Sequence, residues 1–352
     1  MKSRMKSRMK SPKTFPVRSQ ERSPAKSWAP MRTLAGLAML AAASAPAAAQ
    51  NWPERPVTMV IPFAAGGAVD IMGRILAARL GEILGQRVII ENVGGAGGMS
   101  GAYRVAKAAP DGYEFVLGSV GTHAQNQSLY KKQLYNAATD FAPVVLIAET
   151  PLVMVARRDL PASNLPEFIA YARLNQAKMQ YGSAGTGSAN QLACVLLNAA
   201  IGVTVTHVPY RGGEPAIQDL VAGRIDYACS IITTAAPQVQ AGLVKGITIT
   251  TRNRSPILPD LPTAQEQGLK DFEAYTWNAF FMPKGTPDAI VRRLNAATIE
   301  AMNTPIVQQR LKEIGATLVA PERRSPDYLG KFVASEVEKW AGPIKASGAS
   351  VD

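Results

Sequence analysis

The sequence is poor in the side chains on which most metal and enzyme sites depend: among 352 residues it has two cysteines and two histidines. No C-x-x-C pair or other metal-ligand spacing occurs, so we predict no metal site. The G-x-x-x-x-G-K-[ST] loop is also absent. The two G-x-G pairs lead to Ser100 and Asn190, where a dinucleotide-binding loop has a third glycine. We therefore predict no cofactor and no bound nucleotide.

A nucleophile, a base and an orienting carboxylate cannot be assembled from the sequence either. The G-x-S-x-G elbow of α/β-hydrolases is absent. His123 lies in a segment that could border a cleft and act there as a general base. His207 lies in a predicted strand, where a packed ring is the commoner role. The sequence favours a protein that is not an enzyme, and a cleft hydrolase using His123 is the weaker alternative.

The net charge of +12 is concentrated in the first 49 residues. These contain ten lysines and arginines against one acid, Glu21, and so account for nine of the twelve net positive charges, leaving +3 for residues 50–352. A nearly neutral body does not have the basic surface of a nucleic-acid-binding protein. We predict no nucleic-acid partner.

The N-terminal segment has the layout of a secretory signal. Residues 31–50 read MRTLAGLAMLAAASAPAAAQ, with a basic start, an apolar run and an A-x-A site at Ala47–Ala49. We predict a leader over 1–49, cleavage near Ala49-Gln50 and export. Either Met1 or Met31 could be the initiator.

The two cysteines, Cys194 and Cys229, both lie in the exported part. In an oxidising compartment they could form a disulfide. They could also be two small buried side chains without a bond. The 34 residues between them say nothing about their distance, so we favour the unpaired interpretation.

Apolar runs and amphipathic stretches alternate along the exported chain, which indicates an α/β fold with a largely parallel sheet. The expected strands are 57–63, 87–93, 113–119, 142–150, 151–157, 179–185, 205–211, 225–231 and 245–251, and the expected helices are 69–84, 94–109, 165–175, 188–201, 214–223, 287–302, 305–315 and 326–346. About 300 residues of such alternation predict two similar domains. The first comprises 50–152 plus 276–352 and the second 153–275, with a break near 149–153 and a return near 274–277.

Four segments rich in glycine or hydroxyl residues follow predicted strands: 64–70, 118–126, 182–190 and 210–216. In open α/β sheets, ligands bind at the carboxyl ends of the strands. Helices that begin there present free N–H groups and a positive dipole end to the crevice. The segments therefore predict a site for a small anion such as a carboxylate. Asp70, at the start of a predicted helix, has the position of a helix cap.

These segments, together with several others, resemble one known family. The stretches RPVTMVIPFAAGGAVDIMGR, LGQRVIIENVGGAGGMSG, APDGYEF, FAPVVLIAETPLVMVAR, YGSAGTGS, VPYRGGEPAIQDLVAGRIDY, LPDLPTAQEQG and KGTPDAIVRRLN closely resemble the substrate-binding proteins of the tripartite tricarboxylate transporter family, the Bug-type periplasmic receptors. The resemblance runs from about Trp52 to the C-terminus. It implies a type II periplasmic binding protein with two domains that close like a Venus flytrap on a small carboxylate. It also implies a monomer in the periplasm that delivers its solute to membrane permease subunits.

The resemblance also implies which residues bind the solute. The first loop would contribute Phe63, Ala65, Gly66, Gly67, Ala68, Val69 and Asp70; the second Ser119, Thr122, His123 and Asn126; and the other domain Ser183, Gly185, Thr186, Gly187, Tyr210 and Gly212. Near the return crossing, Trp277 could wall the cleft or fill the core, whereas Phe280 and Phe281 favour the core.

Two positions depart from the family pattern. Val69 stands where Ser or Thr is common, and Gln191 stands where His is common. The loss of a hydroxyl at position 69 makes the predicted site less polar. The candidate solutes are thus dicarboxylates or tricarboxylates, acidic amino acids, and acids with an aromatic or aliphatic body. An orphan carboxylate sensor that acts with a signalling partner is the alternative to a transport receptor.

Overall fold

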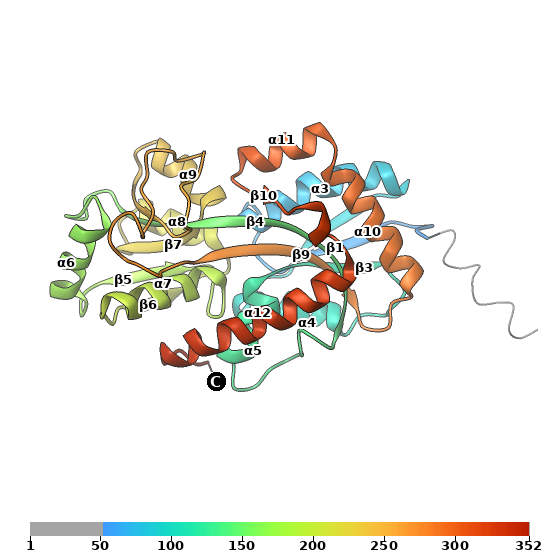
Figure 1. Cartoon of the computed structure of the whole chain (residues 1–352), viewed down its shortest axis with the longest axis horizontal. Helices are drawn as coiled ribbons and strands as arrows, with labels where there is room; N and C mark the ends of the chain where they lie inside the picture. Colours follow the sequence, from blue (N-terminus) through green and yellow to red (C-terminus); the bar gives the residue numbers. More distant parts are fainter. Residues whose placement is uncertain (1–51, 352) are drawn as a thin grey trace, which may run out of the picture. The chain divides into compact units, whose positions relative to one another are not determined.

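The computed structural model describes residues 52–351 and contains a ten-stranded mixed sheet with helices packed around it (Figure 1). One part of the sheet, the first strand group, has parallel strands in the order β2-β1-β3. This group consists of β1 (Val57–Ile61), β2 (Val88–Asn92) and β3 (Glu114–Ser119), with the helices α3 (Ala68–Leu84) and α4 (Met99–Ala106). A short helical turn, η1 (Ala96–Gly98), precedes α4.

The second strand group repeats this arrangement farther along the chain. β5 pairs in parallel with both β6 and β7. The strands are β5 (Gln180–Ser183), β6 (Thr206–Pro209), β7 (Tyr227–Ile231) and β8 (Val244–Ile249); the helices are α6 (Leu165–Asn175), α7 (Ala189–Ile201), α8 (Gly213–Val221) and α9 (Ile232–Gln240).

Two long antiparallel strands, β4 (Phe141–Arg157) and β9 (Tyr275–Pro283), run between the two groups (Figure 1). β4 pairs with β9 as far as Pro151 and with β7 and β8 beyond it. Next to this change of partner, the Thr250 hydroxyl lies 2.8 Å from the carbonyl oxygen of Leu152 and 2.6 Å from that of Ala274, and its one proton can be donated to either. This hydroxyl therefore joins β4 to the segment just before β9, at the point where β4 changes its partner strands.

The C-terminal segment packs mainly on the first strand group. It contains α10 (Asp288–Met302), α11 (Pro305–Glu313), β10 (Thr317–Leu318), η3 (Pro321–Arg323) and α12 (Pro326–Ala346). Between β3 and β4 lie η2 (Gly121–Gln125), which is a π-helical turn, and α5 (Asn126–Leu129). The buried carboxylate of Glu336 on α12 accepts from the indole N–H of Trp277 at 2.9 Å and of Trp340 at 3.1 Å. Trp277 is thus a core residue that joins α12 to β9.

The packing of α3 shows how the sequence pattern produces the core. Its helical spacing places Leu76 and Leu80 on the face that packs into the same cluster as Ile61 of β1, and all three are fully buried. Gly73 permits this contact, because a Cβ atom there would lie 2.7 Å from Cδ1 of Ile61. The helix ends at Gly85, which adopts a left-handed conformation with φ of 72°.

Most predicted elements are present, and the α/β fold class is confirmed, but several details of the prediction are wrong. The sheet is not largely parallel, because β4 and β9 pair antiparallel with their neighbours. Segments 142–150 and 151–157 form the single strand β4, since Pro151 lies where the partners change and does not break the strand. Segment 232–240, not predicted as a helix, is α9, and much of segment 118–126, predicted as a loop, is helical.

Two further points concern the limits of the chain and the membrane. The leader predicted over 1–49 lies outside the described residues. Between residues 52 and 351, no helix combines the length and apolar character needed to cross a membrane.

Candidate functional site

Three helices, α3, α8 and α9, begin around one small cavity between the two strand groups, and the first turn of a fourth, α7, contributes Asn190 to the lining. The cavity has a volume of about 30 Å³. It is lined by Phe63, Gly67, Ala68, Val69, Ala184, Asn190, Gly213, Ile231 and Thr234. Space of this size accommodates roughly two water-sized groups, which is the scale of one carboxylate.

None of the three helix N-termini is capped by a side chain. The residues before the first helical turn are Gly67, Gly212 and Ile231, and none of them accepts an N–H with its side chain. By contrast, the nearby α7 is capped by the Ser188 hydroxyl, which accepts from the backbone N–H of Gln191. An uncapped N-terminus favours an anion by ~0.3–1 kcal/mol when exposed and by up to ~2 kcal/mol when partly buried. The cavity therefore suits a negatively charged group.

The lining side chains add polarity but no charge. Asn190 and Thr234 are only 6% and 7% exposed, and within the described part of the chain neither side chain has a hydrogen-bond partner. Neither is among the polar groups that are both fully shielded from solvent and unpaired, so a ligand or water in the cavity can complete their hydrogen bonds. They are the polar side chains of the cavity that can contact a bound carboxylate.

Asp70 shapes the first loop instead of lining the cavity. One carboxylate oxygen accepts from the backbone N–H of Gly66 at 2.9 Å and from the Arg74 guanidinium at 2.8 Å; the other accepts from the Asn92 amide at 2.9 Å. Burial tends to raise the pKa of Asp70, but the hydrogen bonds from Arg74, Gly66 and Asn92 together bring it below its usual value. Asp70 thus reaches back from the first turn of α3 to fix the loop that precedes it.

The segment after β3 contributes packing near the cavity. The Thr122 hydroxyl accepts from the backbone N–H of Ser119 at 2.9 Å. The His123 ring is fully buried and stacks on Phe281 with 3.9 Å between ring centroids. Burial lowers the pKa of His123 to about 3, so its imidazole is neutral at physiological pH. The structure places this ring in the aromatic core and not in the lining of the cavity.

The two strand groups touch each other around the cavity. The Tyr130 hydroxyl donates to the carbonyl oxygen of Thr186 at 2.8 Å, and the backbone N–H of Ala64 donates to the carbonyl oxygen of Arg211 at 3.2 Å. Gly97 approaches the Thr186 carbonyl so closely that an added Cβ would lie 2.1 Å from the oxygen. These contacts, called the rim contacts below, hold the two strand groups together at residues close in sequence to the lining residues Phe63, Ala184 and Gly213.

Only some of the predicted site residues line the cavity, and the others lie elsewhere in the structure. Phe63, Gly67, Ala68 and Val69 line the cavity. Gly185, Thr186, Gly187, Gly212 and Asn126 lie at contacts between the two strand groups, and Tyr210 donates its hydroxyl to Asp219 at 2.7 Å. Ala65 and Gly66 belong to the loop that Asp70 holds. Ser119 is buried at the end of β3, and Thr122 and His123 are buried within η2. The Ser183 hydroxyl forms a hydrogen bond with Nε2 of His207.

Five lining residues were not among the predicted site residues: Ala184, Asn190, Gly213, Ile231 and Thr234. Ala184, Asn190 and Gly213 lie in two of the glycine-rich segments, so the signal for them was present in the sequence. Ile231 and Thr234 are not predicted as site residues because the sequence does not predict α9. Its first turn has two β-branched threonines and its last turn contains Pro237, which weakens a helical pattern.

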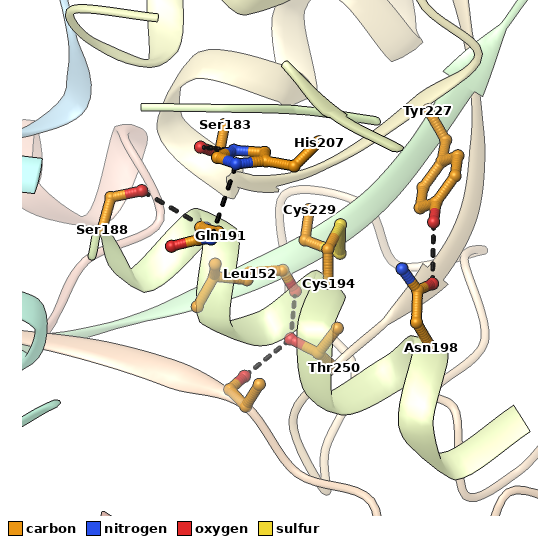
Figure 2. Close-up of a disulfide and its surroundings, with 11 residues drawn as sticks. Leu152, Ser183, Ser188, Gln191, Cys194, Asn198, His207, Tyr227, Cys229 and Thr250 are labelled. Atoms are coloured by element: carbon orange, nitrogen blue, oxygen red, sulfur yellow. Dashed lines mark hydrogen bonds between the residues drawn. A yellow bond between two sulfur atoms is a disulfide. The ribbon is translucent and has the colours of Figure 1, made fainter. Parts of the chain in front are cut away.

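A disulfide supports the wall of the cavity in the second strand group. Cys194 of α7 and Cys229 of β7 are bonded, with Cα atoms 5.4 Å apart, and both are fully buried (Figure 2). The unpaired interpretation of these cysteines is therefore wrong. Cys194 lies one helical turn after Asn190, and Cys229 lies two residues before Ile231, so the bond links two lining segments. Among the described residues, no group of three or more His, Cys, Asp or Glu side chains is placed to hold a metal ion.

The chain is similar to proteins of one family and to several solved structures. The sequence model of one protein family, described as tripartite tricarboxylate transporter family receptor, matches residues 72–349. MatC from Rhodopseudomonas palustris, solved with bound malate, is 41% identical to this chain and superposes on it with a TM-score of 0.81. The match covers 83% of this chain and 100% of the MatC chain. The periplasmic binding protein BugD is 38% identical over 85% of this chain and 99% of its own, with a TM-score of 0.82. Rpa4515 of R. palustris, solved with adipate, is 35% identical over 85% of this chain and 99% of its own, with a TM-score of 0.81.

Proposed function

Because this chain belongs to the tripartite tricarboxylate transporter receptor family, whose members are periplasmic solute-binding receptors and not enzymes, we propose that it captures a small carboxylate where α3, α8 and α9 begin. The observation that carries the proposal is the convergence of three uncapped helix N-termini on one cavity. The related structures with malate and adipate support a carboxylate as the solute. Delivery of that solute to membrane permease subunits is the role that family membership supports.

The energetics leave a clear role for the side chains. Micromolar binding requires about −8 kcal/mol. Three helix ends contribute at most ~6 kcal/mol together. Hydrogen bonds from Asn190 and Thr234, at about 0.5–1.5 kcal/mol each, and apolar contact with Phe63 and Val69 would supply the remainder.

We further propose that the two strand groups are separate domains, 50–152 plus 276–352 and 153–275, which move about β4 and β9. A cavity of about 30 Å³ holds a carboxylate group but not the whole of malate or adipate. The solute would therefore enter and be accommodated only when the rim contacts open or widen. The change of strand partners at Pro151 and the start of β9 at Tyr275 are the places where such movement costs least pairing.

The direct test is a thermal-shift screen of residues 50–352, followed by calorimetry. The panel contains malate, succinate, adipate, citrate, benzoate and glucose. We expect one class of carboxylates to raise the melting temperature, because a ligand that binds only the folded state stabilises it. Stabilisation by glucose alone would contradict the proposal. If no compound acts, the purified protein should be unfolded and the released material analysed for a co-purified acid, and its absence would also contradict the proposal.

The charge of the lining predicts selectivity against amino acids. An α-ammonium group would be buried beside three positive helix ends, and none of the lining side chains is a carboxylate that could pair with it. We expect each acid that binds to do so at least 100-fold more tightly than its 2-amino derivative, for example succinate against aspartate, measured by calorimetry at pH 7. Equal affinities of succinate and aspartate would refute this prediction.

The close contact at Gly97 predicts a variant that cannot close. In Gly97→Ala the new Cβ would meet the Thr186 carbonyl oxygen at 2.1 Å and the Gly187 carbonyl carbon at 2.7 Å, which are backbone atoms that cannot rotate away. We expect at least tenfold weaker carboxylate binding and a larger radius of gyration in X-ray scattering with the carboxylate present.

The matched control is Gly85→Ala. Gly85 also has a positive φ, of 72°, but nothing lies within 4 Å of an added Cβ. This control carries the same kind of backbone strain as Gly97→Ala without the contact. It should lose stability and keep its affinity. Equal loss of affinity in both variants would show that strain, and not closure, is responsible.

A further inference from the structure

His207 is the centre of a hydrogen-bonded group of side chains that contacts the loop 184–187. Its ring stacks on Tyr181 with 4.9 Å between centroids, and its Nε2 lies 2.7 Å from the Ser183 hydroxyl. Its Nδ1 lies 3.5 Å from the side-chain amide nitrogen of Gln191. Figure 2 shows the ring between Ser183 and Gln191, with both interactions drawn.

The side chains of Ser183 and Gln191 also form hydrogen bonds with the backbone of the loop 184–187. The Ser183 hydroxyl accepts from the backbone N–H of Gly185 at 3.1 Å and lies 3.2 Å from the Gly185 carbonyl oxygen, to which it can donate. The Gln191 side-chain oxygen accepts from the backbone N–H of Gly187 at 2.6 Å. This loop contributes Ala184 to the cavity and the Thr186 carbonyl to the contact with Tyr130.

The directions of these hydrogen bonds define one tautomer of His207. The Gly187 N–H occupies the Gln191 oxygen, so the Gln191 NH₂ group faces Nδ1, which must accept. The proton of the neutral ring is then on Nε2 and is donated to the Ser183 hydroxyl, whose own proton goes to the Gly185 carbonyl. In this state each of these hydrogen bonds joins one donor to one acceptor, whereas the other neutral tautomer would set two donors against each other at Gln191.

We propose that neutral His207 is a positioning residue for solute binding: through Ser183 and Gln191 it holds the loop 184–187 in the shape that lines the cavity and closes its rim. This inference concerns how the proposed site is held and therefore rests on the proposed function. Protonation of Nδ1 would set two donors against each other at Gln191 and release the Gly187 N–H. Solute affinity then falls as His207 becomes charged.

The surroundings of the ring agree with a neutral state at physiological pH. Tyr181, Ser183 and Gln191 contact the ring, and burial raises the pKa of Tyr181 to about 12, which keeps its hydroxyl neutral. Within residues 52–351, no charged side chain shifts the pKa of His207, and burial lowers it to about 4. A histidine whose pKa is lowered by folding contributes stability above its ordinary value of about 6.5, and this contribution is lost as the pH falls toward 4.

The test uses two variants and a readout that does not need a solute. His207→Phe keeps a ring on Tyr181 but removes both hydrogen bonds, and His207→Gln keeps an N–H for Ser183 but cannot be protonated. Hydrogen exchange of the solute-free protein should be at least tenfold faster at Gly185 and Gly187 in His207→Phe. The amide of Val203, bonded to Asn198 at 2.9 Å in the same strand group, serves as the reference. Unchanged exchange at both glycines would overturn the proposal even if no carboxylate ever binds.

Affinity then gives the pH dependence. With adipate as the probe, the ratio of dissociation constants, wild type over His207→Gln, should rise at least threefold between pH 6.5 and pH 3.5. A group with a pKa of about 4 is mostly protonated at the lower pH, and ionisation of adipate itself cancels in the ratio. In His207→Phe, adipate should bind at least tenfold more weakly at pH 7. A constant ratio would overturn the role of His207 protonation, whereas failure of adipate and the other acids to bind wild type at pH 7 would count against the proposed function alone.

Discussion

Replacing Gly213 with aspartate is expected to weaken carboxylate binding at least 100-fold while leaving the folded protein as stable as the wild type or more so. Gly213 is the first residue of α8, and an ideal Cβ there would have Thr234 Oγ1, at 3.9 Å, as its nearest neighbour. The new carboxylate would therefore enter the cavity at an uncapped helix N-terminus, where it interacts favourably with the dipole. A solute carboxylate about 4 Å away would be repelled by roughly 4 kcal/mol at an effective dielectric constant near 20. Calorimetry measures the affinity and thermal unfolding measures the stability.

Two control variants separate charge from space. Gly213→Asn has nearly the same shape as the aspartate but no charge, and Gly213→Ala adds only the Cβ, for which there is room. We expect the affinity to decrease in the order alanine, asparagine, aspartate, with a gap of at least tenfold between the last two. If the asparagine variant loses as much affinity as the aspartate variant, the cavity is limited by space and the argument from the helix dipoles fails.

The location of the site could be predicted from the sequence because it follows from a general property of α/β sheets. Glycine-rich segments that follow strands gather at the carboxyl ends of those strands, and three of the four helices that begin at the cavity start in such segments. Gly67, Ala68 and Val69, which local pattern and resemblance predict as binding residues, line this cavity. Asn190 and Gly213 lie within such segments too, but the sequence does not show which residues of a loop face a cavity.

The remaining features depend on tertiary contacts that leave no local signature. α9 has a weak helical pattern, and its start is defined by its position after β7 against β4 and α8. β4 continues through Pro151 because that proline lies where one partner strand ends and the next begins. The burial of His123 follows from its stacking on Phe281, which is 158 residues away in the chain. The approach of Cys194 to Cys229 likewise depends on how α7 packs on β7.

The disulfide provides the second large effect. Replacing both Cys194 and Cys229 with alanine is expected to lower the free energy of unfolding by about 3–4 kcal/mol, because the bond closes a loop with a sequence separation of 35 residues and so restricts the unfolded chain. With the entropy of unfolding expected for a chain of this size, that loss corresponds to a decrease in melting temperature of roughly 6 °C. Urea titration of the wild type and the variant checks the first value, and thermal unfolding checks the second.

A comparison of single and double variants shows whether the bond itself is responsible. Cys194→Ala alone already breaks the bond, so adding Cys229→Ala should cost little more than the loss of one small buried side chain. Independent, additive losses would mean that packing of the two residues matters and the covalent link does not. Because the link joins the segments that carry Asn190 and Ile231, the double variant should also bind its carboxylate several-fold more weakly at a temperature where it remains folded. Full affinity under those conditions would show that α7 and β7 keep the cavity wall in place by packing alone.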